Sequence, residues 1–129
     1  MTFIQSCTAA TVALALALPA SVSAQSLSRP QKNAVRSANS YLNMSGFSRR
    51  GLIEQLSSSY GEGYSESDAR AAVDSLSVDW NDQAVRSARQ YLSMMGFSCS
   101  GLIEQLSSDA GDKYTRSQAT FGARQAGAC

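Results

Sequence analysis

Residues 34–69 read AVRSANSYLNMSGFSRRGLIEQLSSSYGEGYSESDA, and residues 84–119 read AVRSARQYLSMMGFSCSGLIEQLSSDAGDKYTRSQA. The second stretch repeats the first after a shift of 50 residues, with 23 identities over 36 aligned positions and no gap. Unrelated segments do not match so closely, so the chain contains an internal duplication. One copy of this length buries only a marginal core, and we therefore expect the two copies to pack against each other.

Each copy has the hydrophobic spacing of three short helices, which predicts an all-α fold of two tandem helix-turn-helix-like repeats. Ala34, Ala38, Tyr41 and Leu42 share one face of the first helix. The stretch 65–68 resembles a capping box that opens the third helix. The first and second helices are expected at 31–43 and 49–58 in the first copy, and at 82–93 and 99–108 in the second.

Glycine and serine residues mark the predicted helix ends. Gly46 and Gly96 follow the first helix of each copy and suit a left-handed C-terminal cap. Ser48 and Ser98 suit the N-cap of the next helix. Asn81 is the expected N-cap of the first helix in the second copy.

Two glycines and a tryptophan are expected to have packing roles. Gly51 and Gly101 fall inside the second helix of both copies. An interior glycine weakens a helix, so its presence twice predicts that another helix passes close by. Trp80 lies at the joint between the copies, where we expect it to pack rather than to bind a ligand.

The N-terminus resembles an export signal. The apolar stretch 9–18 is followed by Val-Ser-Ala at 22–24, the small-residue pattern that signal peptidase recognises. We therefore predict a signal peptide at 1–24, a first repeat at 25–80 and a second at 81–129. The exported chain is expected to have no transmembrane segment, because the apolar stretch is too short to span a bilayer comfortably. Cys7 precedes this stretch, so it is not placed to accept a lipid.

The composition argues against catalysis and nucleic-acid binding. The 11 basic and 10 acidic residues leave a net charge of +1, and there is no histidine. Histidine-dependent nucleophiles and zinc sites are thereby excluded, and we expect no enzyme activity, cofactor or metal. Arg49 and Arg50 begin a helix that would suit DNA phosphates, but the second copy has Cys99 and Ser100 there. A DNA-binding protein that uses both copies should have such basic residues in both of them.

The repeated elements resemble the Ltp-like repeat of host cell surface-exposed lipoproteins. The similar features are the Ala-x-x-x-Ala-x-x-Tyr-Leu helix, the Phe-Ser turn, Gly-Leu-Ile-Glu-Gln-Leu, and Asp-Trp-Asn-Asp-Gln-Ala at 79–84. The resemblance implies a tandem helix-turn-helix-like module that binds and does not catalyse. It also implies prophage-encoded superinfection exclusion, in which a protein outside the membrane stops incoming phage DNA. The missing lipid-attachment cysteine departs from the family pattern.

The expected partner is a protein of the cell envelope or of a phage. Outward-facing polar residues kept in both copies are the candidate partner-binding residues: Arg36, Glu54, Gln55, Arg86, Glu104 and Gln105. Recent duplication explains their identity equally well. A structural or accessory envelope domain with no role in exclusion is the alternative function.

Removal of the signal peptide leaves two cysteines, Cys99 and Cys129. Export would place them where thiols oxidise, so we predict that they form a disulfide. Two free thiols, or a bridge between chains through Cys129, are the alternatives.

Overall fold

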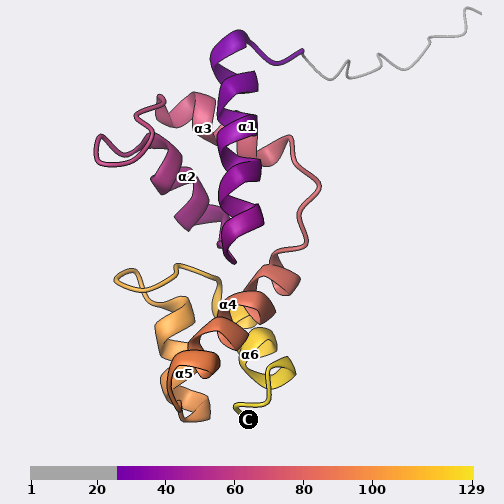
Figure 1. Cartoon of the computed structure of the whole chain (residues 1–129), viewed down its shortest axis with the longest axis vertical. Coiled ribbons are helices and arrows are strands. Elements are labelled where there is room, and N and C mark those ends of the chain that lie inside the picture. The colour runs from indigo at the N-terminus through magenta and orange to yellow at the C-terminus, as the bar shows by residue number, and fades with distance from the viewer. Residues whose placement is uncertain (1–25) are drawn as a thin grey trace, which may run out of the picture.

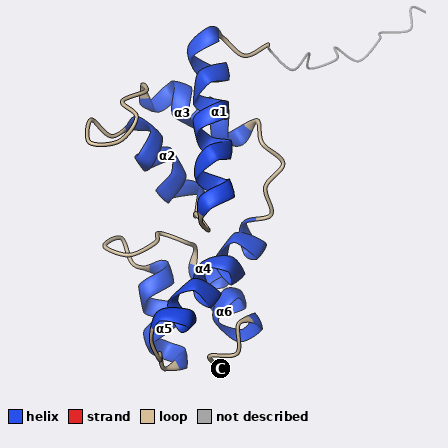
Figure 2. Ribbon diagram, in the orientation of Figure 1, coloured by secondary structure: helices blue, strands red, loops and turns tan. Residues whose placement is uncertain are grey.

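The structure is a computed structural model that describes residues 26–129. It contains six α-helices, and no strand occurs in this part of the chain (Figures 1 and 2). The helices are α1 (Arg29–Met44), α2 (Arg49–Ser57), α3 (Glu66–Asp74), α4 (Trp80–Met94), α5 (Cys99–Ser107) and α6 (Arg116–Gln125). The all-α prediction is confirmed. The predicted signal peptide lies outside the described residues.

The helices form two three-helix units, which we call repeat 1 (α1–α3) and repeat 2 (α4–α6). Figure 1 shows them one beyond the other along the long axis of the molecule. Each has its own apolar core, where α3 packs on α1 and α2, and α6 packs on α4 and α5. Leu52 and Leu56 are fully buried in the first core, as are Leu102 and Leu106 in the second. Burial of these repeated leucines is the main apolar contribution to the stability of each unit.

Serine side chains cap the helices as predicted. The Ser48 Oγ accepts from the Gly51 backbone N–H at 2.9 Å, and the Ser98 Oγ accepts from the Gly101 N–H at 3.0 Å. Ser65 likewise accepts from the N–H of Asp68, the third residue of α3, but no bond returns from the Asp68 side chain to the Ser65 N–H, so only half of the expected capping box is present. These bonds satisfy donors that have no partner within the helix.

Three local expectations are wrong. The chain leaves α1 and α4 in an extended conformation at Ser45 and Met95, so Gly46 and Gly96 are not left-handed caps. The N-cap of α4 is Asp79 and not Asn81. The Asp79 carboxylate accepts from two free N–H groups of the first turn, at 2.9 and 3.2 Å. The negative charge of Asp79 also suits the positive end of the helix dipole.

Gly51 and Gly101 do not mark a close helix crossing, which corrects the third expectation. Each is the third residue of its helix, within the first turn. A Cβ there would lie 2.9 Å from the Ser48 Oγ or 2.8 Å from the Ser98 Oγ. The serine cap does not itself require glycine, because Gln31 and Asp68 occupy the same position behind Ser28 and Ser65. At Gly51 a Cβ would also lie 3.3 Å from the Asp112 carbonyl oxygen, so the segment that comes close there is a loop of repeat 2 and not a helix.

The connection between the repeats is short. Helix α4 begins at Trp80, so the predicted boundary between residues 80 and 81 falls within its first turn. Trp80 packs against the core of repeat 1, although it is the first residue of a repeat 2 helix. The packing role expected for Trp80 is therefore confirmed, and it attaches the start of α4 to the preceding repeat.

Candidate functional site between the repeats

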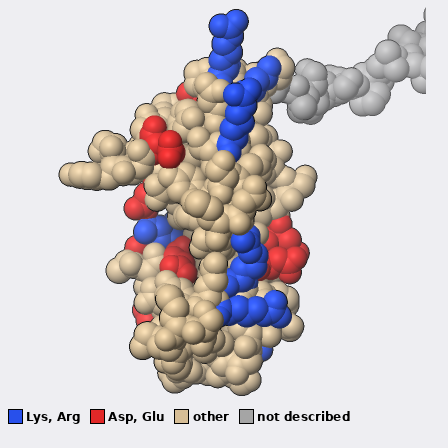
Figure 3. Space-filling view, in the orientation of Figure 1, with Lys and Arg blue, Asp and Glu red and all other residues tan. Residues whose placement is uncertain are grey.

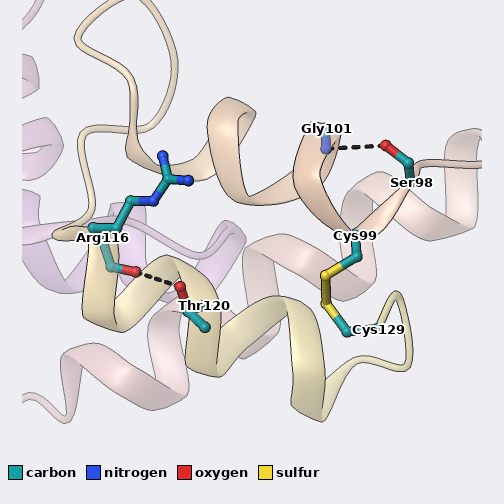
Figure 4. Close-up of a disulfide and its surroundings, with 6 residues drawn as sticks. All are labelled: Ser98, Cys99, Gly101, Arg116, Thr120 and Cys129. Atoms are coloured by element: carbon teal, nitrogen blue, oxygen red, sulfur yellow. Dashed lines mark hydrogen bonds between the residues drawn. A yellow bond between two sulfur atoms is a disulfide. The ribbon is translucent and has the colours of Figure 1, made fainter.

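A disulfide joins Cys99, the first residue of α5, to Cys129, which follows α6 (Figure 4). Their Cα atoms lie 4.7 Å apart and 30 residues apart in sequence. The predicted disulfide is confirmed. It fastens the end of the chain to the same helix start that Ser98 caps. In repeat 1, Arg49 occupies the position of Cys99, so the covalent link belongs to repeat 2 alone.

A cleft of about 680 Å³ lies at the junction of the two repeats. One side is the turn after α1 and the start of α2, residues 45–51, which we call the docking turn of repeat 1. Opposite it is the receiving wall of repeat 2: Ser87, Gln90, Tyr91, Met94 and Asp112. Figure 3 shows basic and acidic side chains close together at this level of the surface. The junction cleft is thus open, and apolar, polar and charged groups all line it.

Hydrogen bonds between backbone and side chain join the two repeats. Ser48 donates its hydroxyl to the backbone carbonyl of Asp112, while the same Oγ caps α2. The Phe47 N–H donates to the Gln83 side chain at 3.3 Å. The Gly46 N–H and Ser45 hydroxyl both donate to the Gln90 amide oxygen, at 3.3 and 3.2 Å. Each residue of the docking turn from 45 to 48 is therefore bonded to repeat 2.

Two ion pairs bridge the same junction. The Arg50 guanidinium lies 3.0 Å from the Asp109 carboxylate, and the Lys113 ammonium lies 3.4 Å from the Glu54 carboxylate. Asp109 and Lys113 belong to the loop between α5 and α6, which lies below α2 in Figure 1. The Arg50–Asp109 pair is exposed and contributes little to stability, whereas Lys113 is largely buried, and both pairs fix which surfaces meet.

Gly46 is required by close approach and not by a special backbone angle. A Cβ at this position would lie 2.5 Å from the Ser87 Oγ and 2.8 Å from the Gln83 carbonyl oxygen. Only a residue without a side chain lets the docking turn reach the backbone of α4. Its counterpart Gly96 has open space around it.

Each repeat contains the same hydrogen-bonded triad of glutamine, tyrosine and carboxylate. In repeat 2 the Gln105 amide donates to the Tyr91 Oη at 3.1 Å, and the Tyr91 hydroxyl donates to Asp112 at 2.8 Å. In repeat 1 the corresponding bonds, at 3.1 and 2.7 Å, run from Gln55 to Tyr41 and on to Glu62. In each repeat the triad holds a carboxylate near the C-terminal end of the first helix, which is α1 in repeat 1 and α4 in repeat 2.

Burial sets the protonation behaviour of the triad at the cleft. It raises the pKa of Tyr91 to about 12, and the bond to Asp112 adds to the increase. Burial also raises the pKa of the Asp112 carboxyl, against the opposing effects of Tyr91 and Lys113. In repeat 1 the bond to Glu62 is the main cause of a raised Tyr41 pKa. Tyr91 therefore remains a neutral hydrogen-bond donor at physiological pH.

The two candidate arginines differ in exposure and in their contacts. Arg36 is exposed on α1. Arg86 is half-buried in the junction, where its guanidinium donates to the Leu42 carbonyl at 2.7 Å and to Gln83 at 3.1 Å. The expectation that both face outward is wrong for Arg86, because the other repeat covers it.

The candidate glutamates and glutamines on α2 and α5 also differ in exposure. Glu54 and Glu104 are exposed, with Lys113 and Arg116 as their ion-pair partners at 3.4 Å. Gln55 and Gln105 are half-buried, because their amides turn back to the tyrosine of the preceding helix. The outward orientation expected for these glutamines is therefore wrong. Of the six candidates, the cleft contains Glu54 and Gln55.

Sequence reasoning missed the side of the cleft formed by residues 109–113. Sequence differences between the two copies could have indicated this side of the cleft. Arg50, Asp109 and Lys113 form the ion pairs of the junction, and the other copy has uncharged residues at their positions. Charges found in one copy alone were therefore a better guide to the junction than identities.

The arrangement suits binding. Among the described residues, no group of three or more Cys, Asp or Glu side chains is placed to hold a metal ion. Arg49 makes a bidentate pair with Asp74 at 2.7 and 2.9 Å, and this bond lowers the pKa of the Asp74 carboxyl. The two arginines that suggested phosphate contact thus have carboxylate partners. None of the described helices is long and apolar enough to cross a membrane.

The family model of host cell surface-exposed lipoproteins matches the chain twice, at residues 30–76 and 79–124. The chain belongs to this family. The two matches correspond to α1–α3 and α4–α6, so each match covers one three-helix unit. The resemblance inferred from the sequence is confirmed. No curated protein matches the chain.

Among solved structures, the chain is similar to Ltp, a superinfection exclusion protein from the Streptococcus thermophilus temperate phage TP-J34. The identity is 29%, and the match covers 75% of this chain and 95% of Ltp, with a TM-score of 0.67. Both repeats of this surface-lipoprotein family member therefore have a counterpart in the Ltp structure. Neither the family description nor the description of Ltp names an enzyme.

Proposed function

We propose that the chain is an exported binding protein that attaches to a protein of the cell envelope or of a phage and takes part in superinfection exclusion. The observation that carries this proposal is the match to Ltp over 95% of that chain, within a family described as exposed on the host cell surface. The open cleft, which both apolar and polar groups line, supports binding as the mode of action.

Export is part of the proposal. Residues 1–24 act as a Sec-type signal peptide, and the exported chain begins at Gln25. The Cys99–Cys129 disulfide supports this route, because such bonds persist in oxidising compartments. Mass spectrometry of the extracytoplasmic fraction should find a chain that starts at Gln25, without a lipid. An intact chain starting at Met1 in the cytosol would contradict the route.

We place the partner contact on the exposed charges kept in both repeats. The Glu54 and Glu104 carboxylates are 61% and 69% exposed, and each has a single basic neighbour. The Glu104–Arg116 pair is exposed on both sides and therefore weak, so a basic group of the partner can replace Arg116. Lys113 is largely buried in the junction, so a partner would contact Glu54 on its exposed side. Arg36 supplies a third exposed charge. Gln55, Gln105 and Arg86 hold the surrounding helices in place and contribute indirectly.

Charge removal tests this surface. The variant Glu54→Gln with Glu104→Gln removes both carboxylates without placing a new positive charge beside Lys113 or Arg116. We expect it to fold, because exposed substitutions usually change stability by less than about 0.5 kcal/mol. Capture of the partner from envelope extracts or phage particles should fall, and phage should plate more efficiently on cells producing the variant.

A matched control removes two carboxylates that are not kept in both repeats, since Glu66 aligns with Arg116 and Asp82 with Lys32. Glu66→Gln with Asp82→Asn changes the net charge equally at two exposed helix starts. It should retain capture and exclusion. Equal loss in both variants would assign the effect to net charge. If cells producing the wild-type chain admit phage as readily as cells without it, exclusion is wrong and the accessory-domain function replaces it.

A further inference from the structure

The contact between the repeats is directional, and each of its two surfaces occurs a second time in the chain. The docking turn of repeat 1 meets the receiving wall of repeat 2. After a shift of 50 residues, the same wall in repeat 1 consists of Ser37, Ser40, Tyr41, Met44 and Glu62. These five residues line a separate hollow of about 290 Å³ that no other described residue covers.

The second docking turn is equally uncovered. Residues 95–101 of repeat 2 correspond to residues 45–51 of repeat 1. A Cβ at Gly96 would have no neighbouring atom within 4 Å, whereas a Cβ at Gly46 would collide with α4. Ser98 is exposed, whereas its counterpart Ser48 is 2% exposed. The chain thus has one open surface of each kind, at opposite repeats.

Some hydrogen bonds of the junction can form again between the open surfaces, but those that Gln90 accepts are lost, because Ser40 replaces Gln90 and Met95 replaces Ser45. Arg36 matches Arg86, and the Leu92 carbonyl matches that of Leu42, which accepts the Arg86 bond. Within residues 26–129, Arg36 has no ion-pair or side-chain hydrogen-bond partner, and α4 has no basic residue in its last turn. A docked Arg36 would supply the cation that favours the carbonyl end of α4.

The close contact between a glycine and a serine at the junction also has a counterpart at the open surfaces. Gly96 would face Ser37, as Gly46 faces Ser87. The loop that accepts the capping serine has the same backbone in both repeats, since Gly63 has φ 69° and its counterpart Lys113 has φ 63°. The Glu62 carbonyl is therefore available to Ser98 as the Asp112 carbonyl is to Ser48.

The ion pairs are not retained. Ser100 and Ser59 replace Arg50 and Asp109, and Gly63 replaces Lys113. The linker that holds the repeats together within one chain is absent between chains. Contact through the open surfaces is therefore weaker than the junction and depends on protein concentration.

We propose that a second copy of this chain docks its 95–101 turn on the open wall of repeat 1, head to tail. A heterologous contact of this kind leaves one open surface at each end, so further copies can add in the same direction. This assembly does not depend on the proposed partner binding or on phage exclusion, but it would cover Arg36, one of the three charges of the proposed partner surface.

Sedimentation velocity of residues 25–129, which contain all six helices, tests the assembly over a concentration series. Gly96→Leu blocks the docking turn, and its side chain extends into open space in the single chain. Ser40→Trp fills the open wall from an exposed helix position. Each variant should weaken self-association roughly tenfold to a hundredfold, the effect expected of overpacking a contact. Ser117→Leu, exposed on α6 and outside both surfaces, should associate like wild type.

Mixing the two blocked variants decides the geometry. Gly96→Leu retains an open wall and Ser40→Trp retains an open turn, so the mixture should form dimers that neither variant forms alone. Longer assemblies should not appear in the mixture. The proposal is overturned if wild type remains monomeric at every concentration, if the blocked variants associate normally, or if their mixture stays monomeric.

Discussion

The Arg86 guanidinium of α4 donates a hydrogen bond of 2.7 Å to the Leu42 carbonyl of α1. Helix α1 has no basic residue in its own last turn, so repeat 2 supplies the cation at this helix end. The bond makes Arg86 a structural residue, while its duplicate Arg36 remains exposed on the surface.

We predict that Arg86→Ala lowers the free energy of unfolding by about 1.5–3 kcal/mol, the usual contribution of a hydrogen bond to a charged group. Arg36→Ala is the matched control and should change it by less than about 0.5 kcal/mol. Urea denaturation in dilute solution measures both. Equal effects would mean that the Leu42 bond does not stabilise the chain.

Removal of the disulfide should have a larger effect. Cys99→Ser is expected to lower stability by about 3–4 kcal/mol, because the unfolded chain is no longer restricted by a closed loop of this length. Wild type under reducing conditions should show a similar loss. Titration of unreduced, denatured wild type should find no reactive thiol at Cys99 or Cys129, and two thiols per chain would exclude the bond.

The duplicated glycines should respond differently to the same change. Gly46→Leu forces a side chain against the Ser87 backbone and should destabilise the chain by about 1–3 kcal/mol or more. Gly96→Leu should be tolerated by the single chain, because its surroundings are open. Thermal unfolding at low concentration gives the comparison. A Gly46→Leu protein as stable as the Gly96→Leu protein would argue against close contact at the junction.

Stability should decrease at alkaline pH. The folded chain raises the pKa of Tyr91 to about 12, compared with about 10 for an unfolded tyrosine, so it holds this proton more tightly. The resulting stabilisation is complete below pH about 10 and is lost as the pH rises toward 12. Tyr91→Phe should make this part of the stability profile less steep but not flat, because burial also raises the pKa of Tyr114. An unchanged slope would exclude Tyr91 as its source.

The duplication predicts most of the fold but little of the junction. Serines at helix starts and leucines at helical spacing act through nearby residues, and these are alike in both copies. Ser48 and Ser98 therefore cap as expected. The cap at Asp79 was not predicted, because the polar side chains at 79, 81 and 82 can each act as an N-cap. Which of them does so depends on the residue at which the helix begins.

The candidate site depends on surroundings that the repeat pattern does not contain. Arg36 and Arg86 lie in identical Ala-Val-Arg-Ser-Ala sequences, and only the packing of the repeats distinguishes them. Gln55 has an outward position by helical spacing, yet its amide reaches the Tyr41 hydroxyl. Periodicity assigns a side chain to a face of its own helix, and it does not show what covers that face.

The Arg50–Asp109 and Glu54–Lys113 pairs also make the order of the repeats matter. A circular permutant that placed α4–α6 before α1–α3 would encode the same helices and the same two cores. Its new junction would bring Ser100 opposite Ser59 and Glu104 opposite Gly63. The two halves of this gene are therefore no longer interchangeable, although most of their aligned residues are still identical.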